Sequence, residues 1–200
     1  MESGNDAPVM PPEVASWRTA ERTRLINERM RLGVDERRDL ADKVTRHLDT
    51  LLGDVTGLVI SGWWPIRGEL DLRPWLAGLA DRGARAALPL VAERAQPLIF
   101  RPWATGAKME RGFWNIPVPV EGPEIAPDIV LAPVVGFDAA GYRLGHGGGY
   151  FDRTLAALKP MPRPIGVGLT SARLATIHPQ PHDIPMQAIV TEEGVLPGTA

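Results

Sequence analysis

The sequence contains no cysteine, and this absence excludes several kinds of chemistry. Without a thiol, the chain cannot form a disulfide, a thiolate zinc site or a cysteine nucleophile. It also has no uninterrupted run of 18 apolar residues, the length that a membrane-spanning helix needs. The first residues are polar and acidic and lack the apolar core of a signal peptide. We therefore expect a cytoplasmic protein with no membrane partner.

Clusters of positive charge are also missing. The net charge is −2, and no run of basic residues is longer than a pair, so an extended nucleic-acid interface is not favoured. The chain has 200 residues, of which 44% are hydrophobic, and this is enough for one domain with a sizeable core. The 20 prolines and 21 glycines indicate many short elements joined by defined loops.

The apolar patterns predict helices and strands in alternation. Helices are expected at residues 13–31, 35–52, 71–79 and 154–158. Strands are expected at residues 57–64, 84–90, 97–103, 129–135, 165–169 and 188–191, and residues 104–127 are expected to form a loop. This order predicts a three-layer α/β/α fold of Rossmann-like type, with a mostly parallel central sheet. We expect a disordered tail over residues 1–12 and a single domain over residues 13–200.

Residues 141–149 contain five glycines in nine positions, after an apolar strand and before a helix. A strand, a glycine-rich turn and a helix start can cradle a phosphate, because exposed amides converge on the anion. Arg143 and Arg153 could hold further phosphate oxygens, and Asp152 could hold a magnesium ion. The spacing matches neither the P-loop nor the dinucleotide motif, so a flexible glycine hairpin is the alternative.

Two other features can be interpreted in two ways. Arg18, Arg22 and Arg29 share roughly one face of the first helix, either as a solvated stripe paired with Glu21 and Glu28 or as a binding surface. The proline-bounded Phe113 and Trp114 could form a wall for a flat ligand or plug the core. Residues 63–64, the glycine loop and the turn at Asp183 all follow strands, so they could meet in one cleft.

Several motifs together match one family. They lie at residues 68–71, 100–103, 114, 127–153, 181–183 and 189–192. In this order the sequence resembles the 5-formyltetrahydrofolate cyclo-ligases, also called methenyltetrahydrofolate synthetases, over about residues 16–196. The resemblance implies an enzyme that converts 5-formyltetrahydrofolate to 5,10-methenyltetrahydrofolate with ATP and magnesium. In that chemistry the formyl oxygen attacks the γ-phosphate, and N10 of the folate then closes the ring and expels phosphate.

The resemblance also implies roles for individual residues. The implied ATP-binding residues are Arg18, Arg22, Arg143, Leu144, Gly145, His146, Gly147, Gly148, Gly149, Tyr150 and Phe151. The implied folate-binding residues are Trp64, Glu69, Trp114, His146, Gly147, Gly148, Gly149 and Tyr150, with Glu69 accepting hydrogen bonds from pterin N–H groups. The implied magnesium ligands are Asp152 and Asp183, and the implied catalytic residues are Arg143, Tyr150 and Asp152.

The sequence departs from the family pattern at six positions. Arg18 replaces a lysine, Glu21 an apolar residue, His146 a tyrosine or basic residue, Phe151 a tyrosine, Val118 a glutamate and Gln187 an aspartate. These departures keep two alternatives open: a paralogue that acts on another N-formyl or pterin-like substrate, and a non-catalytic folate- or nucleotide-binding protein. The expected partners are a reduced folate and ATP, and the expected state is a monomer or weak homodimer.

Overall fold

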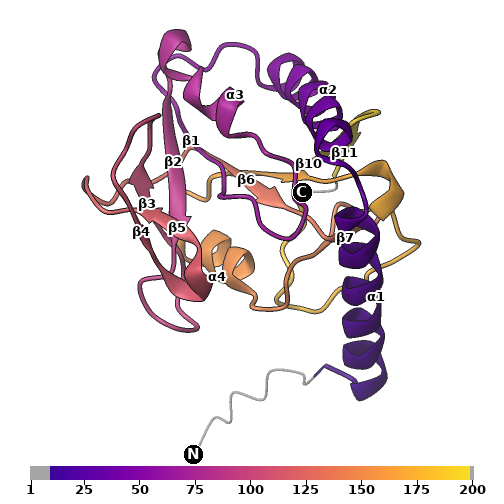
Figure 1. Cartoon of the computed structure of the whole chain (residues 1–200). Coiled ribbons are helices and arrows are strands. Elements are labelled where there is room, and N and C mark those ends of the chain that lie inside the picture. Colours follow the sequence, from indigo (N-terminus) through magenta and orange to yellow (C-terminus); the bar gives the residue numbers. More distant parts are fainter. Residues whose placement is uncertain (1–9, 199–200) are drawn as a thin grey trace, which may run out of the picture.

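The fold is built on a seven-stranded sheet within residues 10–198, the part of the chain that the computed structural model describes. The strand order is β11-β10-β9-β6-β1-β2-β3 (Figure 1). The parallel strands are β1 (Val59–Ser61), β2 (Arg85–Leu90), β6 (Ile129–Pro133), β9 (Arg163–Val167) and β10 (Ala188–Thr191). The two edge strands, β3 (Ile99–Pro102) and β11 (Gly194–Pro197), run antiparallel to their neighbours.

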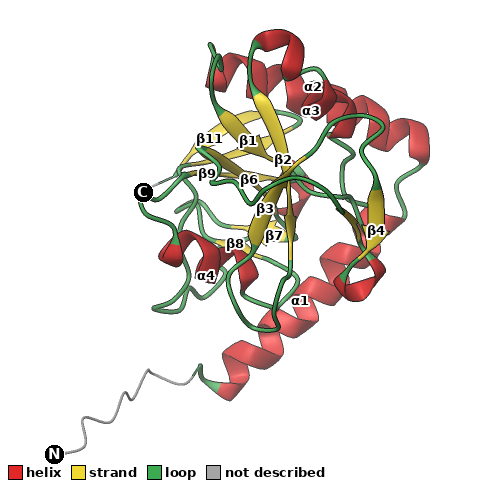
Figure 2. Cartoon of the chain, turned by 90° about the vertical axis from the view of Figure 1, so that its left-hand side faces the viewer, coloured by secondary structure: helices red, strands yellow, loops and turns green. Residues whose placement is uncertain are grey.

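Helices cover both faces of this sheet (Figures 1 and 2). One face packs against α2 (Val34–Leu52) and α3 (Arg73–Ala77), and the other against α1 (Pro12–Met30) and α4 (Tyr150–Ala157). The central strand β6 shows why two layers can form. Its side chains alternate between faces, so that Leu131 joins the α2 side and Val130 the α1 side, and both are fully buried. The predicted three-layer α/β fold with a mostly parallel sheet is confirmed.

Short strands account for most of the differences from the sequence prediction. The segment expected to be a loop forms a hairpin of β4 (Met109–Arg111) and β5 (Pro117–Pro119), joined by a 3-10 turn at Phe113–Asn115. A second hairpin, β7 (Gly136–Phe137) and β8 (Arg143–Leu144), separates β6 from the glycine loop. Strands of two or three residues are too short to show a period in hydrophobicity, which is why the sequence did not reveal them.

The helix boundaries differ more modestly. Helix α1 begins at Pro12, inside the expected tail of residues 1–12, and residues 1–9 of that tail lie outside the described part of the chain. Helix α3 covers only part of the expected 71–79 helix and is followed by a 3-10 turn at Ala80–Arg82. In the described residues, every helix is too short or too polar to cross a membrane.

The buried central strand leads to a prediction about stability. Leu131→Ala should lower the free energy of unfolding by about 2–5 kcal/mol, because it removes a fully buried side chain and leaves a cavity. Val195→Ala is the control, since Val195 is partly exposed on the edge strand β11 and should change stability much less. Urea unfolding of both variants checks this, and equal losses would show that β6 is not the centre of the core.

Candidate functional site

The glycine loop connects β8 to α4, and its backbone needs glycine at two positions. Gly149 precedes the first turn of α4 with φ +63°, and Gly147 has φ +96°. Residues other than glycine rarely adopt such backbone angles. The loop therefore delivers backbone amides at the N-terminus of a helix, where the helix dipole favours an anion.

Helix α1 lies against this loop through its arginines. The Arg22 Nε–H donates a hydrogen bond to the carbonyl oxygen of Gly145 at 2.9 Å. Burial lowers the pKa of the Arg22 guanidinium, and the nearby charge of Arg18 lowers it further. Arg18 and Arg29 are also buried, whereas Glu21 and Glu28 pair with the more exposed Arg24. The interpretation of the arginines as a solvated stripe is therefore wrong.

Two arginine–aspartate pairs lie beside the loop. Arg18 Nη2 donates to Asp183 Oδ2 at 2.5 Å, and Arg18 Nε donates to a backbone carbonyl oxygen at 3.0 Å. Arg143 Nη1 donates to Asp152 Oδ1 at 3.0 Å, and the same oxygen accepts the N–H of Ile184 at 3.0 Å. Because Ile184 follows Asp183, this last hydrogen bond holds the two aspartates in the same region, although they are far apart in sequence.

These aspartates have the donor chemistry that magnesium requires. Asp152 Oδ2 accepts no hydrogen bond within the described residues, and the His182 Nε2 atom lies 3.9 Å from Asp183 Oδ1. Two carboxylate oxygens are hard ligands of the kind that suits magnesium, which usually keeps water and phosphate oxygens as well. No three acidic, histidine or cysteine side chains of the described chain are grouped as a metal site. The chemistry of the two aspartates thus fits a magnesium ion whose other ligands would be phosphate and water oxygens.

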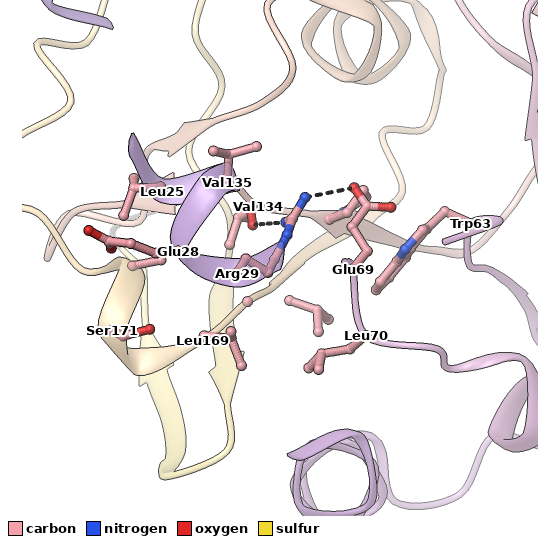
Figure 3. A pocket seen from close by; sticks show the side chains of 14 residues that line it. Leu25, Glu28, Arg29, Trp63, Glu69, Leu70, Val134, Val135, Leu169 and Ser171 are labelled. Carbon is pink, nitrogen blue, oxygen red and sulfur yellow. Dashed lines mark hydrogen bonds and ion pairs between the residues drawn. The ribbon is translucent and has the colours of Figure 1, made fainter. Parts of the chain in front are cut away.

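Glu69 lies at the other end of the site and is almost fully buried. Its Oε2 accepts the N–H of Ile66 at 2.9 Å, and its Oε1 lies 2.8 Å from Nε2 of His146 in the glycine loop. It borders a cavity of about 30 Å³, which Arg29 and Trp63 also line (Figure 3). Neither of these two residues was singled out as a ligand contact from the sequence, although Arg29 belonged to the arginine stripe. His146 therefore links the glycine loop to the buried Glu69 carboxylate by a direct contact.

The aromatic candidates occupy different places. Trp114 is 64% exposed, in a turn with φ +53°, and its ring lies 5.4 Å from that of Tyr150 in an edge-to-face arrangement. Its exposure favours a wall over a core plug. The hydroxyl oxygen of Tyr150 accepts the N–H of Ala95 at 3.2 Å. The ring of Trp64 lies 4.2 Å from the Arg73 guanidinium and packs partly against the core.

Three departures from the family pattern have clear local surroundings. Val118 is buried in β5, an environment that suits an apolar side chain. Gln187 Oε1 accepts a hydrogen bond from Arg163 Nε at 2.7 Å. The ring of Phe151 lies 5.8 Å from the Arg143 guanidinium, close enough for a cation–π contact.

Comparison with known proteins adds independent information. The model of the 5-formyltetrahydrofolate cyclo-ligase family matches residues 14–192 of this chain. The chain belongs to this family. The resemblance found in the sequence is thereby confirmed, and membership makes the protein a ligase of folate one-carbon metabolism.

Family members from several bacteria resemble this chain over most of its length. The 5-formyltetrahydrofolate cyclo-ligase of Mycolicibacterium smegmatis is 31% identical, covering 72% of this chain and 80% of that protein. The enzyme of the same name from Escherichia coli K12 is 26% identical, covering 86% and 98%. The structure of 5,10-methenyltetrahydrofolate synthetase from Aquifex aeolicus has a TM-score of 0.78 at 29% identity, covering 92% and 93%.

The buried Arg18–Asp183 pair of this family member predicts a stability effect in the absence of ligand. Asp183→Ala should lower the free energy of unfolding by about 3 kcal/mol, because it leaves a buried guanidinium without its counter-charge. Asp35→Ala is the control, since it breaks an exposed pair with Arg38 and should change stability by less than about 1 kcal/mol. Urea unfolding measures both, and matching values would mean that water screens the Asp183 pair as well.

Proposed function

We propose that the protein catalyses the cyclisation of 5-formyltetrahydrofolate to 5,10-methenyltetrahydrofolate, with ATP and magnesium, and releases ADP and phosphate. One observation carries this proposal: the glycine loop is joined to arginines and aspartates on one side and to a buried glutamate on the other, through Arg22 and His146. A nucleotide on the loop and a folate on the glutamate would therefore lie next to each other.

The loop amides of residues 144–151 would bind the triphosphate, with Arg18, Arg22 and Arg143 around it. Guanidinium groups suit this role because they offer several N–H donors in a fixed plane. Each of these arginines already has a protein acceptor: Asp183, the Gly145 carbonyl oxygen and Asp152, respectively. Phosphate oxygens would replace or share these acceptors, so the arginines are held close to their working positions before the nucleotide arrives.

Asp152 and Asp183 would hold the magnesium ion. When bound, the ion neutralises charge on the phosphates and so favours transfer of the terminal phosphoryl group. Asp152 is fixed for this purpose by Arg143 and by the Ile184 amide, which both contact its Oδ1 and leave Oδ2 open.

Glu69 would accept hydrogen bonds from the N–H groups of the pterin. Trp64, Trp114 and Tyr150 would supply aromatic contacts to the flat rings of the folate. The formyl oxygen of the bound folate would attack the γ-phosphorus and release ADP. N10 would then attack the activated carbon, and the departure of phosphate together with the N10 proton would close the ring. Tyr150 is the first residue of α4, and Arg143 reaches this helix from β8 through its contact with Asp152, so both could orient the phosphoryl group. No covalent link to the protein is needed, so positioning and charge neutralisation would supply the catalysis.

The activity can be tested directly. Methenyltetrahydrofolate absorbs light where the formyl substrate does not, so its formation is followed with ATP and magnesium, and with each omitted in turn. We expect turnover only in the complete mixture. ATP hydrolysis that requires another N-formyl or pterin-like compound would instead support the paralogue. Binding of folate and ATP without product would support the non-catalytic alternative.

Asp152 provides a sharper test of the proposed metal site. Asp152→Ala should reduce magnesium-dependent turnover by at least about a hundredfold, because it removes one of the two carboxylates that would hold the ion. Glu121→Ala, on an exposed loop, is the matched control and should have normal activity. Circular dichroism establishes that both variants are folded, and near-normal turnover of Asp152→Ala would remove this residue from the metal site.

A further inference from the structure

Arg29 is a buried arginine of α1. It lies beside Glu69 (Figure 3). Its Nε donates to the carbonyl oxygen of Arg67 at 3.1 Å, and its Nη1 lies 3.5 Å from the carbonyl oxygen of Val134. The third nitrogen, Nη2, is buried, has no hydrogen-bond partner within the described residues, and lies 3.8 Å from Glu69 Oε1. The guanidinium is thus anchored by two backbone carbonyls and directs its remaining group at the carboxylate.

Glu69 Oε1 therefore has two partners of different kinds. The Arg29 contact is an ion pair too long for a hydrogen bond, so it supplies charge without occupying a lone pair. The His146 contact is a hydrogen bond at 2.8 Å, and it does occupy one. His146 is also partly exposed and belongs to the glycine loop, whereas Arg29 is held by the core. Arg29 is therefore the fixed partner of Glu69, whereas a ligand donor can replace His146.

The charges around Glu69 come from several elements. Arg29 and Glu28 reach its cavity from α1, His146 faces it from the glycine loop, and Arg67 precedes it in its own turn. A buried carboxylate needs such positive charge and hydrogen-bond donors around it to offset the loss of water. Burial lowers the pKa of Arg29, while the negative charge of Glu69 acts in the opposite direction and favours the charged guanidinium.

We propose that Arg29 is a positioning residue that keeps the Glu69 carboxylate ionised and in place. When the substrate binds, its N–H groups replace His146 as hydrogen-bond donors to Glu69. This inference rests on the proposed function and identifies how the folate subsite keeps an acceptor ready. A flat heterocycle with adjacent N–H donors fits such a carboxylate. Arg29 itself need not contact the ligand, because Glu69 accepts the hydrogen bonds from the ligand N–H groups.

A double-mutant cycle tests the proposal. Calorimetry gives the Kd of 5-formyltetrahydrofolate for the wild type, Arg29→Met, Glu69→Gln and the double variant. We expect each single variant to bind about tenfold more weakly or worse, and the double variant to match Glu69→Gln, because Arg29 acts through the charge of Glu69. The Kd of a non-hydrolysable ATP analogue should stay within about threefold in all four. Losses that simply multiply would overturn the proposal and leave Arg29 as a packing residue.

Arg29→Lys covers the case in which Arg29→Met fails to fold. A lysine keeps the charge but not the two carbonyl contacts, so folate affinity should fall less than in Glu69→Gln, and a loss as large as that of Glu69→Gln would overturn the proposal. A second measurement needs no ligand: carbon-13 NMR of the Glu69 carboxyl in the free protein. Glu69 should titrate at a higher pH in Arg29→Met than in the wild type and Arg29→Lys, and an unchanged titration would refute the inference. Because it uses no folate, this result stands apart from any failure of the wild type to bind 5-formyltetrahydrofolate, which would count against the proposed function instead.

Discussion

The site depends on the packing of one helix, α1, through arginines that are buried on folding. Removing a guanidinium from water is costly, and the cost is offset only where the charge meets a carboxylate or several carbonyl oxygens. Arg18 meets Asp183, Arg22 meets the Gly145 carbonyl oxygen, and Arg29 meets Glu69 and two carbonyl oxygens. Each pairing fixes α1 against a different part of the site: the Asp183 turn, the glycine loop and the Glu69 turn. The helix therefore acts as a common support for segments that come from distant parts of the sequence.

Much of the fold could be predicted from the sequence. Buried strands such as those around Ile60 and Leu131 are strongly apolar, and their alternation with amphipathic helices was enough for the three-layer α/β class. The hairpins at 109–119 and 136–144 were missed because their strands are short and, at Pro117 and Pro119, contain residues typical of loops. Such strands form because tertiary contacts align them, and local sequence carries little trace of that.

The candidate site was predictable to a different degree in different places. The glycine loop could be predicted from the sequence, because five glycines in nine residues do not stabilise a core and indicate a special backbone conformation. The burial of the arginine stripe could not be read from α1 alone, because the same spacing suits a solvated helix. The contacts of Arg18 with Asp183 and of Arg29 with Glu69 show which side of α1 is buried. Arg29 lay outside the roles that the family resemblance implied, and only its distance to Glu69 brought it into the site.

The two edge strands have a consequence for how the molecule behaves among its own copies. Each edge contains a proline, Pro102 in β3 and Pro197 in β11, and each runs antiparallel to a parallel interior. A proline offers no N–H, so a second chain that tried to extend the sheet would meet an interrupted row of hydrogen-bonding groups on either side. Pairing of copies through these two edges of the seven-stranded sheet is therefore disfavoured.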